Sequence, residues 1–367
     1  MFGTFTQAGH AIPLVMKRVA SLGTATRPKR PQEPKRPFSY REEEVTVSVP
    51  SGYGPQRASA PVSLAGTLTL PPGKGPFPAV LFITGSGPED RDETVFDHKP
   101  FLVISDALTR AGIATLRFDD RGTGKSGGAM KGLTTLDFAQ DAIAELTFLA
   151  ARPEIDVRAL GIIGHSEGGT IAPIVASQGP LPRFLVLLAG TGVTGLELLR
   201  KQIPAGMRAD GVGEGVIARS MKVNETLLAI VKRESDPSKI EAQLRQMLKD
   251  DPKGLAEVLP SLPAMSDPWL RAFLVLDPVP YLQKVKVPVL ALNGERDVQV
   301  DPSNLQLIEK ALKTGGNKHV TAVVMPGLNH LFQHAKTGAV SEYVAIEETI
   351  APDVLAKIRD YILDAKK

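Results

Sequence analysis

A serine flanked by glycines is the residue in this chain best placed to do chemistry. Ser166 lies in the segment GHSEGG (residues 164–169), directly after the apolar run 160–163. Glycines two residues on either side let a strand turn straight into a helix and hold the serine side chain out at the apex. The backbone N–H of Glu167 then stands at a helix start, where partial positive charge favours a developing oxyanion. The segment predicts a nucleophile elbow.

The residues around the motif decide whether it is evidence for a nucleophile elbow. The pattern Gly-x-Ser-x-Gly is weak evidence by itself, because a glycine-rich chain produces it by chance. Here an apolar strand-like run precedes the serine, and residues 170–176 continue as an apolar helical pattern. An exposed Gly/Ser turn, the alternative, would have polar flanks. The context favours the elbow.

A serine nucleophile needs a histidine base and an acid that orients the histidine. In an open α/β sheet these follow in the order serine, acid, histidine, each after a later strand. Asp297 comes just after the apolar run 289–292, and His330 comes just after the run 320–325. These two residues are therefore the predicted acid and base.

Two further acids and five further histidines compete for these roles. Glu295 and Asp301 lie in the same turn as Asp297, which is preferred for its position. His334, only four residues beyond His330, is the serious rival base. His10 lies in the amino-terminal segment, and His98 lies in a loop after a strand. His165 adjoins the nucleophile, with its side chain expected to point away, and His319 precedes a strand.

A second oxyanion donor is expected in the loop after the apolar run 79–83. Residues 84–88, TGSGP, are small enough to let a substrate approach the backbone. We predict that the N–H of Ser86, or less favourably that of Gly87, acts together with the N–H of Glu167. A tight turn that merely needs glycine is the alternative.

A second glycine-rich segment, DDRGTGKS (residues 119–126), suggests a phosphate-binding loop. A true phosphate loop has a glycine five residues before its Gly-Lys pair, and Asp119 occupies that position. Nucleotide binding is therefore rejected. We expect Asp120 and Arg121 to lock this loop through a charge-assisted hydrogen bond. No dinucleotide fingerprint and no metal-ligand spacing is found, so no cofactor is expected.

The apolar patterns predict a mostly parallel sheet. Apolar and polar residues alternate over 43–49 and 63–70, as in antiparallel strands with one wet face. Continuous apolar runs, typical of parallel strands buried on both faces, follow at residues 79–83, 113–118, 160–163, 184–188, 289–292 and 320–325. Helical patterns lie between them at residues 101–111, 134–149 and 303–313. A doubly wound sheet results, and ligands bind at the carboxyl ends of such strands.

The interval 189–288 is too long for a simple crossover and contains helical patterns at 216–233 and 239–249. We interpret it as a helical cap. Its only tryptophan, Trp269, shares one face of a short helix with Phe273. Packing against the main domain and lining an acyl pocket remain open alternatives for this pair.

The predicted division of the chain has four parts. A hairpin-like segment, with strands at 4–7 and 12–19, and a proline-rich linker occupy residues 1–37. The core covers residues 38–190 and 286–367, and the cap covers 191–285. The linker, RPKRPQEPKRP (residues 27–37), is expected to be extended, with basic residues that serve solubility.

Composition limits the partners and the compartment. With 43 basic and 40 acidic residues the net charge is +3 and no block of one sign dominates, so neither nucleic acid nor membrane binding is implied. The absence of cysteine excludes disulfides and thiolate chemistry. No apolar run reaches the roughly 18 residues of a membrane span, so a soluble protein is expected. Residues 1–20 lack the pattern of a signal peptide, which predicts a cytoplasmic protein unless the amino terminus is truncated.

Taken together, these motifs resemble bacterial serine esterases of the α/β-hydrolase superfamily. The similarity covers residues 40–366 and rests on TGSGPEDRDE, LRFDDRGTGKSGG, GHSEGG, ALNGERDVQV and GLNHLFQ. More narrowly, the chain resembles the EstD-like carboxylesterases. That resemblance implies an eight-stranded, mostly parallel sheet with helices on both faces, a helical cap, and a triad of Ser166, Asp297 and His330 that cleaves short acyl esters.

The family also bears on localisation. Members often carry an export signal and an extra amino-terminal domain, and this chain begins at what resembles the last hairpin of that domain. A periplasmic or secreted protein is therefore expected if the amino terminus is truncated. Thr84 stands where many relatives have histidine.

The expected activity is acyl transfer to water through an acyl-enzyme, with a small ester as substrate. An acyl-CoA thioesterase or a peptidase could use the same triad. A catalytically silent binding module that keeps the fold is an alternative of another class. The oligomeric state stays open, with a homodimer as one option.

Overall fold

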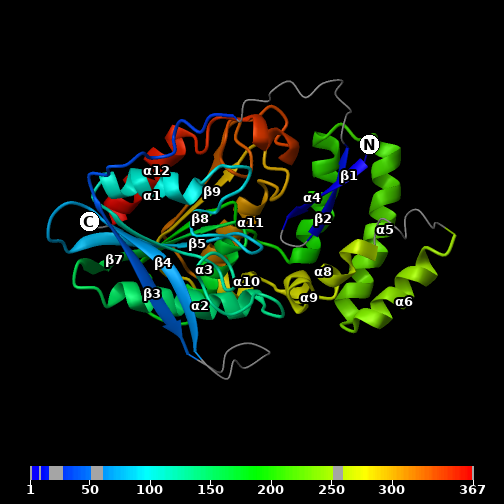
Figure 1. Ribbon diagram of the computed structural model, residues 1–367, viewed down its shortest axis with the longest axis horizontal. Coiled ribbons are helices and arrows are strands. Elements are labelled where there is room, and N and C mark those ends of the chain that lie inside the picture. The colour runs from blue at the N-terminus through cyan, green and yellow to red at the C-terminus, as the bar shows by residue number, and fades with distance from the viewer. Residues whose placement is uncertain (1, 8–9, 16–27, 51–60, 251–258, 366–367) are drawn as a thin grey trace.

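The computed structural model of the protein describes residues 2–7, 10–15, 28–50, 61–250 and 259–365, the backbone alone at 2–7, 10–15 and 365. An eight-stranded sheet runs through the molecule (Figure 1). In sheet order its strands are β10 (Val320–Met325), β9 (Val289–Gly294), β8 (Phe184–Leu188), β7 (Ile155–His165), β5 (Phe77–Ile83), β6 (Ala114–Phe118), β4 (Val62–Leu70) and β3 (Arg41–Val49).

The direction of each strand follows the pattern of its residues. The continuous apolar runs form the six parallel strands β5 to β10, and the alternating segments form the antiparallel strands β3 and β4. Strands β5, β6, β8 and β9 are buried almost throughout. The expectation of two buried faces is wrong for β10, where the side chain of Val324 is 44% exposed, because this strand lies at the edge of the sheet.

Helices cover both faces of the sheet, as predicted. On one face α1 (Pro100–Arg110) and α12 (Pro352–Ala365) pack on the sheet. On the other face lie α2 (Thr135–Ala150), α3 (Gly168–Ala176) and α11 (Asn304–Thr314). Figure 1 shows α1 and α12 above the strands and α2 below them.

The residues before α2 form the predicted capping box. The carboxylate of Asp137 accepts the backbone N–H of Thr134 at 2.8 Å, which satisfies a donor that the helix start leaves free. This cap fixes where α2 begins, and the first residue of the helix, Thr135, reaches the site described below.

Between β8 and β9 the described residues 195–250 and 259–275 form a helical insertion. Its members are α4 (Gly195–Ala209), α5 (Glu214–Arg233), α6 (Pro237–Met247), η1 (Leu259–Ser261), α8 (Leu262–Met265) and α9 (Pro268–Val275). Buried leucines and isoleucines of α5, α6 and α9 give it a core of its own. Figure 1 shows the insertion to one side of the sheet. The chain returns to the sheet through α10 (Val279–Leu282).

The amino-terminal segment differs in part from expectation. Strands β1 (Phe2–Gln7) and β2 (His10–Val15) pair as a separate antiparallel hairpin, and residues 16–19 of the expected second strand lie outside the described part. In the linker, Arg30 does not serve solubility alone: its guanidinium donates to the carbonyls of Ile346 and Phe96 at 2.7 and 2.8 Å. The linker is therefore attached to the core.

Within the described residues, no helix combines the length and apolarity needed to cross a membrane.

Candidate active site

The predicted elbow lies between β7 and α3. Ser166 follows the last residue of β7 and has a φ of 53°, a left-handed conformation that is costly for a residue with a side chain. A Cβ at Gly164 would lie 2.1 Å from the carbonyl oxygen of Gly168, and one at Gly168 would lie 2.2 Å from that of Ile83. Only glycine fits at these two places, so the sharp turn depends on both.

Asp297 and His330 lie at the carboxyl ends of β9 and β10 and meet there. The Nδ1–H of His330 donates to Oδ2 of Asp297 at 2.7 Å, and both residues are 4% exposed. The other carboxylate oxygen of Asp297 accepts the N–H groups of Gln299 and Val300, each at 2.8 Å. These bonds fix the acid and leave Nε2 of His330 as the ring nitrogen able to accept a proton.

The rival residues have other partners. The carboxylate of Glu295 accepts the N–H of Gly327, and that of Asp301 accepts the N–H of Ser303. His334 is exposed and binds Glu348. His98 is buried, and its ring bonds to Thr349 and to the carbonyl of Tyr343. Of the three acids weighed for this role, Asp297 is thus the one that contacts the predicted base, His330.

The loop that carries His330 packs on the elbow. The ring of His165, the residue before Ser166, donates from Nε2 to the carbonyl of His330 at 3.0 Å, and the two rings lie 4.8 Å apart. Within the described part of the chain, no hydrogen bond joins the Ser166 hydroxyl to His330. Such bonds are often long without substrate and tighten when it binds.

His165 carries a charge in this buried setting. Burial lowers the pKa of His165, but the carboxylate of Glu93, the carbonyl of His330 and the carboxylate of Asp297 together raise it to about 9. The imidazolium can then donate from both nitrogens, to Glu93 at 2.8 Å and to the His330 carbonyl. Its role is to hold the loops together, as expected of a side chain that points away from the apex.

The loop after β5 approaches the elbow closely. A Cβ at Gly85 would lie 3.4 Å from Cβ of Ser166, and the Gly85 N–H donates to the Glu93 carboxylate at 2.9 Å. The N–H groups of Ser86 and Glu167 donate to no acceptor among the described residues. Both predicted oxyanion donors are therefore left without an acceptor in the described part of the protein.

Asp120 and Arg121 do not lock their loop through each other. Asp120 accepts the Thr84 hydroxyl at 3.0 Å and the Glu89 N–H at 2.9 Å, and Arg121 binds Asp141 of α2 at 2.6 Å. Each residue therefore fastens this loop to a different neighbour.

Trp269 of α9 reaches the elbow. Its indole Nε1–H donates to the Glu167 carboxylate at 3.0 Å, and its ring stacks on Phe273 at 5.1 Å. Both rings also pack against the core of the helical insertion. The observed packing is thus with the insertion's own core, while packing of the rings against the main domain and the acyl-pocket role both stay predictions.

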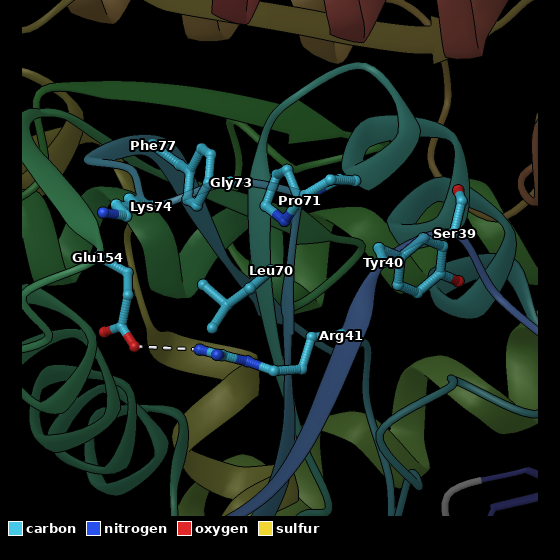
Figure 2. A pocket seen from close by; sticks show the side chains of 10 residues that line it. Ser39, Tyr40, Arg41, Leu70, Pro71, Gly73, Lys74, Phe77 and Glu154 are labelled. Atoms are coloured by element: carbon cyan, nitrogen blue, oxygen red, sulfur yellow. Dashed lines mark hydrogen bonds and ion pairs between the residues drawn. The ribbon is translucent and has the colours of Figure 1, made fainter.

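A cavity of about 420 Å³ lies away from this edge (Figure 2). It is lined by the start of β3, the end of β4 and the start of β5, so it lies at the amino ends of the parallel strands. Figure 2 shows Arg41 and Glu154 paired across it. Its lining includes Ser39 but no histidine that could act as its base, so the candidate active site remains at the opposite edge.

A mostly parallel sheet with a serine on a strand-to-helix turn, and an acid and a histidine after later strands, is the arrangement of the α/β-hydrolase fold. The family model of X-Pro dipeptidyl-peptidase (S15 family) matches residues 61–331. The chain belongs to this family.

Named relatives agree with this fold. Esterase EstD of Thermotoga maritima is 27% identical over 295 residues, which cover 80% of this chain and 61% of the relative. The chain thus matches less than two thirds of that protein's length. The predicted resemblance to EstD is confirmed.

Solved structures share the fold at low sequence identity. The Pyrococcus furiosus esterase Pf2001 has a TM-score of 0.55 at 15% identity, with 90% of this chain and 92% of that chain covered. The α/β hydrolase GrgF from Penicillium sp. sh18 has a TM-score of 0.53 at 16% identity, with 89% and 98% covered. These likenesses confirm the predicted fold class.

Two side chains near the elbow were not identified from the sequence. Glu93 binds both Gly85 and His165, and Thr135 donates its hydroxyl to Glu167 at 2.6 Å. Glu93 lies within the quoted segment TGSGPEDRDE, but nothing in that segment distinguishes it from the other acids. Their roles depend on contacts between distant parts of the chain, which spacing does not reveal.

Replacing Gly164 by alanine should disrupt the elbow, because the new methyl group meets backbone that cannot move aside. We expect a loss of about 1–3 kcal/mol in the free energy of unfolding, measured by denaturant titration. Gly179→Ala is the matched control, since nothing lies within 4 Å of a Cβ there. Equal stability of the two variants would contradict the proposed need for glycine.

Removing the Glu93 carboxylate should change how stability depends on pH. His165 has a folded pKa of about 9, above its ordinary 6.5, so the pair stabilises the fold fully below about pH 6.5 and loses this effect as pH rises through 9. Unfolding of wild type and Glu93→Gln should therefore differ most near pH 6.5, by about 3 kcal/mol, and this gap should narrow as pH rises through 9. His334→Gln, at the exposed pair with Glu348, should show little difference at any pH. A constant gap for Glu93→Gln across this range would be evidence against a charged His165.

Proposed function

We propose that this protein is a serine hydrolase that cleaves carboxylic esters with Ser166, Asp297 and His330. The observation that carries the proposal is the buried hydrogen bond from His330 to Asp297, beside the elbow that presents Ser166. The similarity to Esterase EstD supports ester hydrolysis as the reaction.

In the proposed reaction, Nε2 of His330 takes the hydroxyl proton as Ser166 attacks the ester carbonyl. Asp297 accepts a hydrogen bond from the protonated Nδ1 of His330 and stabilises the imidazolium that forms. His330 then returns the proton to the departing alcohol, which leaves an acyl group on Ser166. Water, deprotonated by the same imidazole, releases the acid in the second step.

The negative charge on the carbonyl oxygen needs donors in the transition state. The free N–H groups of Ser86 and Glu167 suit this role, since one belongs to the loop beside the elbow and the other to the start of α3. We further propose that Trp269 and Phe273 border the acyl group and that short acyl chains are preferred.

The direct test is turnover of p-nitrophenyl acetate and butyrate. Ser166→Ala should lower kcat by about 10⁴-fold or more, because nucleophile and base act as one unit. Asp297→Asn should also lower kcat by several orders of magnitude, through loss of the correct histidine tautomer. Full activity of Ser166→Ala on both esters would end the proposal.

Peptide hydrolysis is a second candidate, because the matched family is described by its X-Pro dipeptidyl-peptidases. The same three side chains could attack an amide. Rates on Ala-Pro-p-nitroanilide, p-nitrophenyl butyrate and a butyryl thioester at equal concentration separate the alternatives. The ester should be cleaved fastest, and faster cleavage of the anilide would favour the peptidase.

A further inference from the structure

The carboxylate of Glu167 lies at a junction between the elbow and two distant parts of the chain. The residue is buried, and its Oε1 accepts the Thr135 hydroxyl at 2.6 Å and the indole N–H of Trp269 at 3.0 Å. Oε2 is also within 3.2 Å of the same indole nitrogen. Thr135 is the first residue of α2, and Trp269 belongs to the helical insertion.

The pKa of the Glu167 carboxyl group depends on its hydrogen-bond donors. Burial raises the pKa of Glu167, while hydrogen bonds from Thr135, Trp269 and Ser86 lower it again. Removing a donor from a buried carboxylate costs free energy, because no water molecule replaces the missing hydrogen bond. The contact between Trp269 and Glu167 thus favours the insertion in its docked position and the elbow in its present geometry together.

We propose that Glu167 is a positioning residue that couples docking of the helical insertion to alignment of the oxyanion donors. The inference rests on the proposed function. One residue carries both the backbone N–H that would receive the oxyanion and the side chain that Trp269 binds. A shift of α9 therefore acts on the start of α3 through a single side chain.

The coupling acts on the rate of the chemical step. The oxyanion develops in the transition state, so a misaligned donor lowers kcat with little effect on ground-state binding. A Trp269 that only lined the substrate pocket would instead change KM, and a purely structural Trp269 would change stability alone. The three roles therefore separate experimentally.

The test uses Trp269→Phe, which keeps a stacked ring and removes the donor, and Glu167→Gln, which keeps the shape and removes the charge. Each should lower kcat on p-nitrophenyl butyrate about tenfold, with KM within about threefold of wild type. The double variant should be no slower than the slower single variant, because both changes remove one interaction. Thr135→Val, which removes another donor to the same carboxylate, should also lower kcat.

Arg200→Gln is the control within the insertion. It breaks an exposed ion pair with Glu225 that joins α4 to α5 and includes neither Trp269 nor Glu167, and it should leave kcat unchanged. Because Trp269 is the only tryptophan, its emission spectrum reports the contact directly. Glu167→Gln should shift that spectrum, and Arg200→Gln should not.

Three results would overturn the inference: unchanged kcat in both single variants, a change in KM alone, or multiplying effects in the double variant. Failure of the proposed function has a different signature, since wild type itself would then not turn over the ester. A shifted spectrum in Glu167→Gln with wild-type kcat would establish the contact and reject its role in catalysis.

Discussion

The site depends on a hydrogen bond between two side chains that lie 33 residues apart, His330 and Asp297. It forms because β9 and β10 are parallel neighbours, so the turns after them emerge at one edge of the sheet. The carboxylate is buried and needs further donors, which Gln299 and Val300 supply from the same turn. The fold thereby holds the acid in a fixed position and the histidine oriented at the edge where β7 ends in Ser166.

The residues on either side of Ser166 hold this edge together. His165 connects the loop after β5, through Glu93, to the backbone of His330. Glu167 connects α2 to the helical insertion through Thr135 and Trp269. Burial also disfavours charge on two further carboxyl groups near this edge, because it raises the pKa of Glu89 and of Asp120 to about 8. Each element that borders the proposed oxyanion site is thus joined to the elbow by a side chain next to the serine.

Much of this could be predicted from the sequence because the signals are local. Continuous apolar runs predicted the parallel strands, and the elbow motif placed Ser166. For the acid and the base the predicted partners, Asp297 and His330, do bind each other. In the supporting loops the sequence does not reveal the partners: Asp120 and Arg121 are expected to bind each other, whereas each binds another residue. Glu93 was missed for the same reason. Which residues bind each other in these loops depends on how loops from distant strands pack together. Such packing produces no periodic pattern and no fixed spacing in the sequence.

The central claim is that Ser166 is activated by His330 at this edge. Covalent labelling by a fluorophosphonate, mapped to a residue by mass spectrometry of the digested protein, tests it most directly. The account predicts one modified residue, Ser166, in the wild type, and labelling slowed by orders of magnitude in His330→Ala. An unlabelled Ser166, or equally fast labelling without the imidazole, would contradict it.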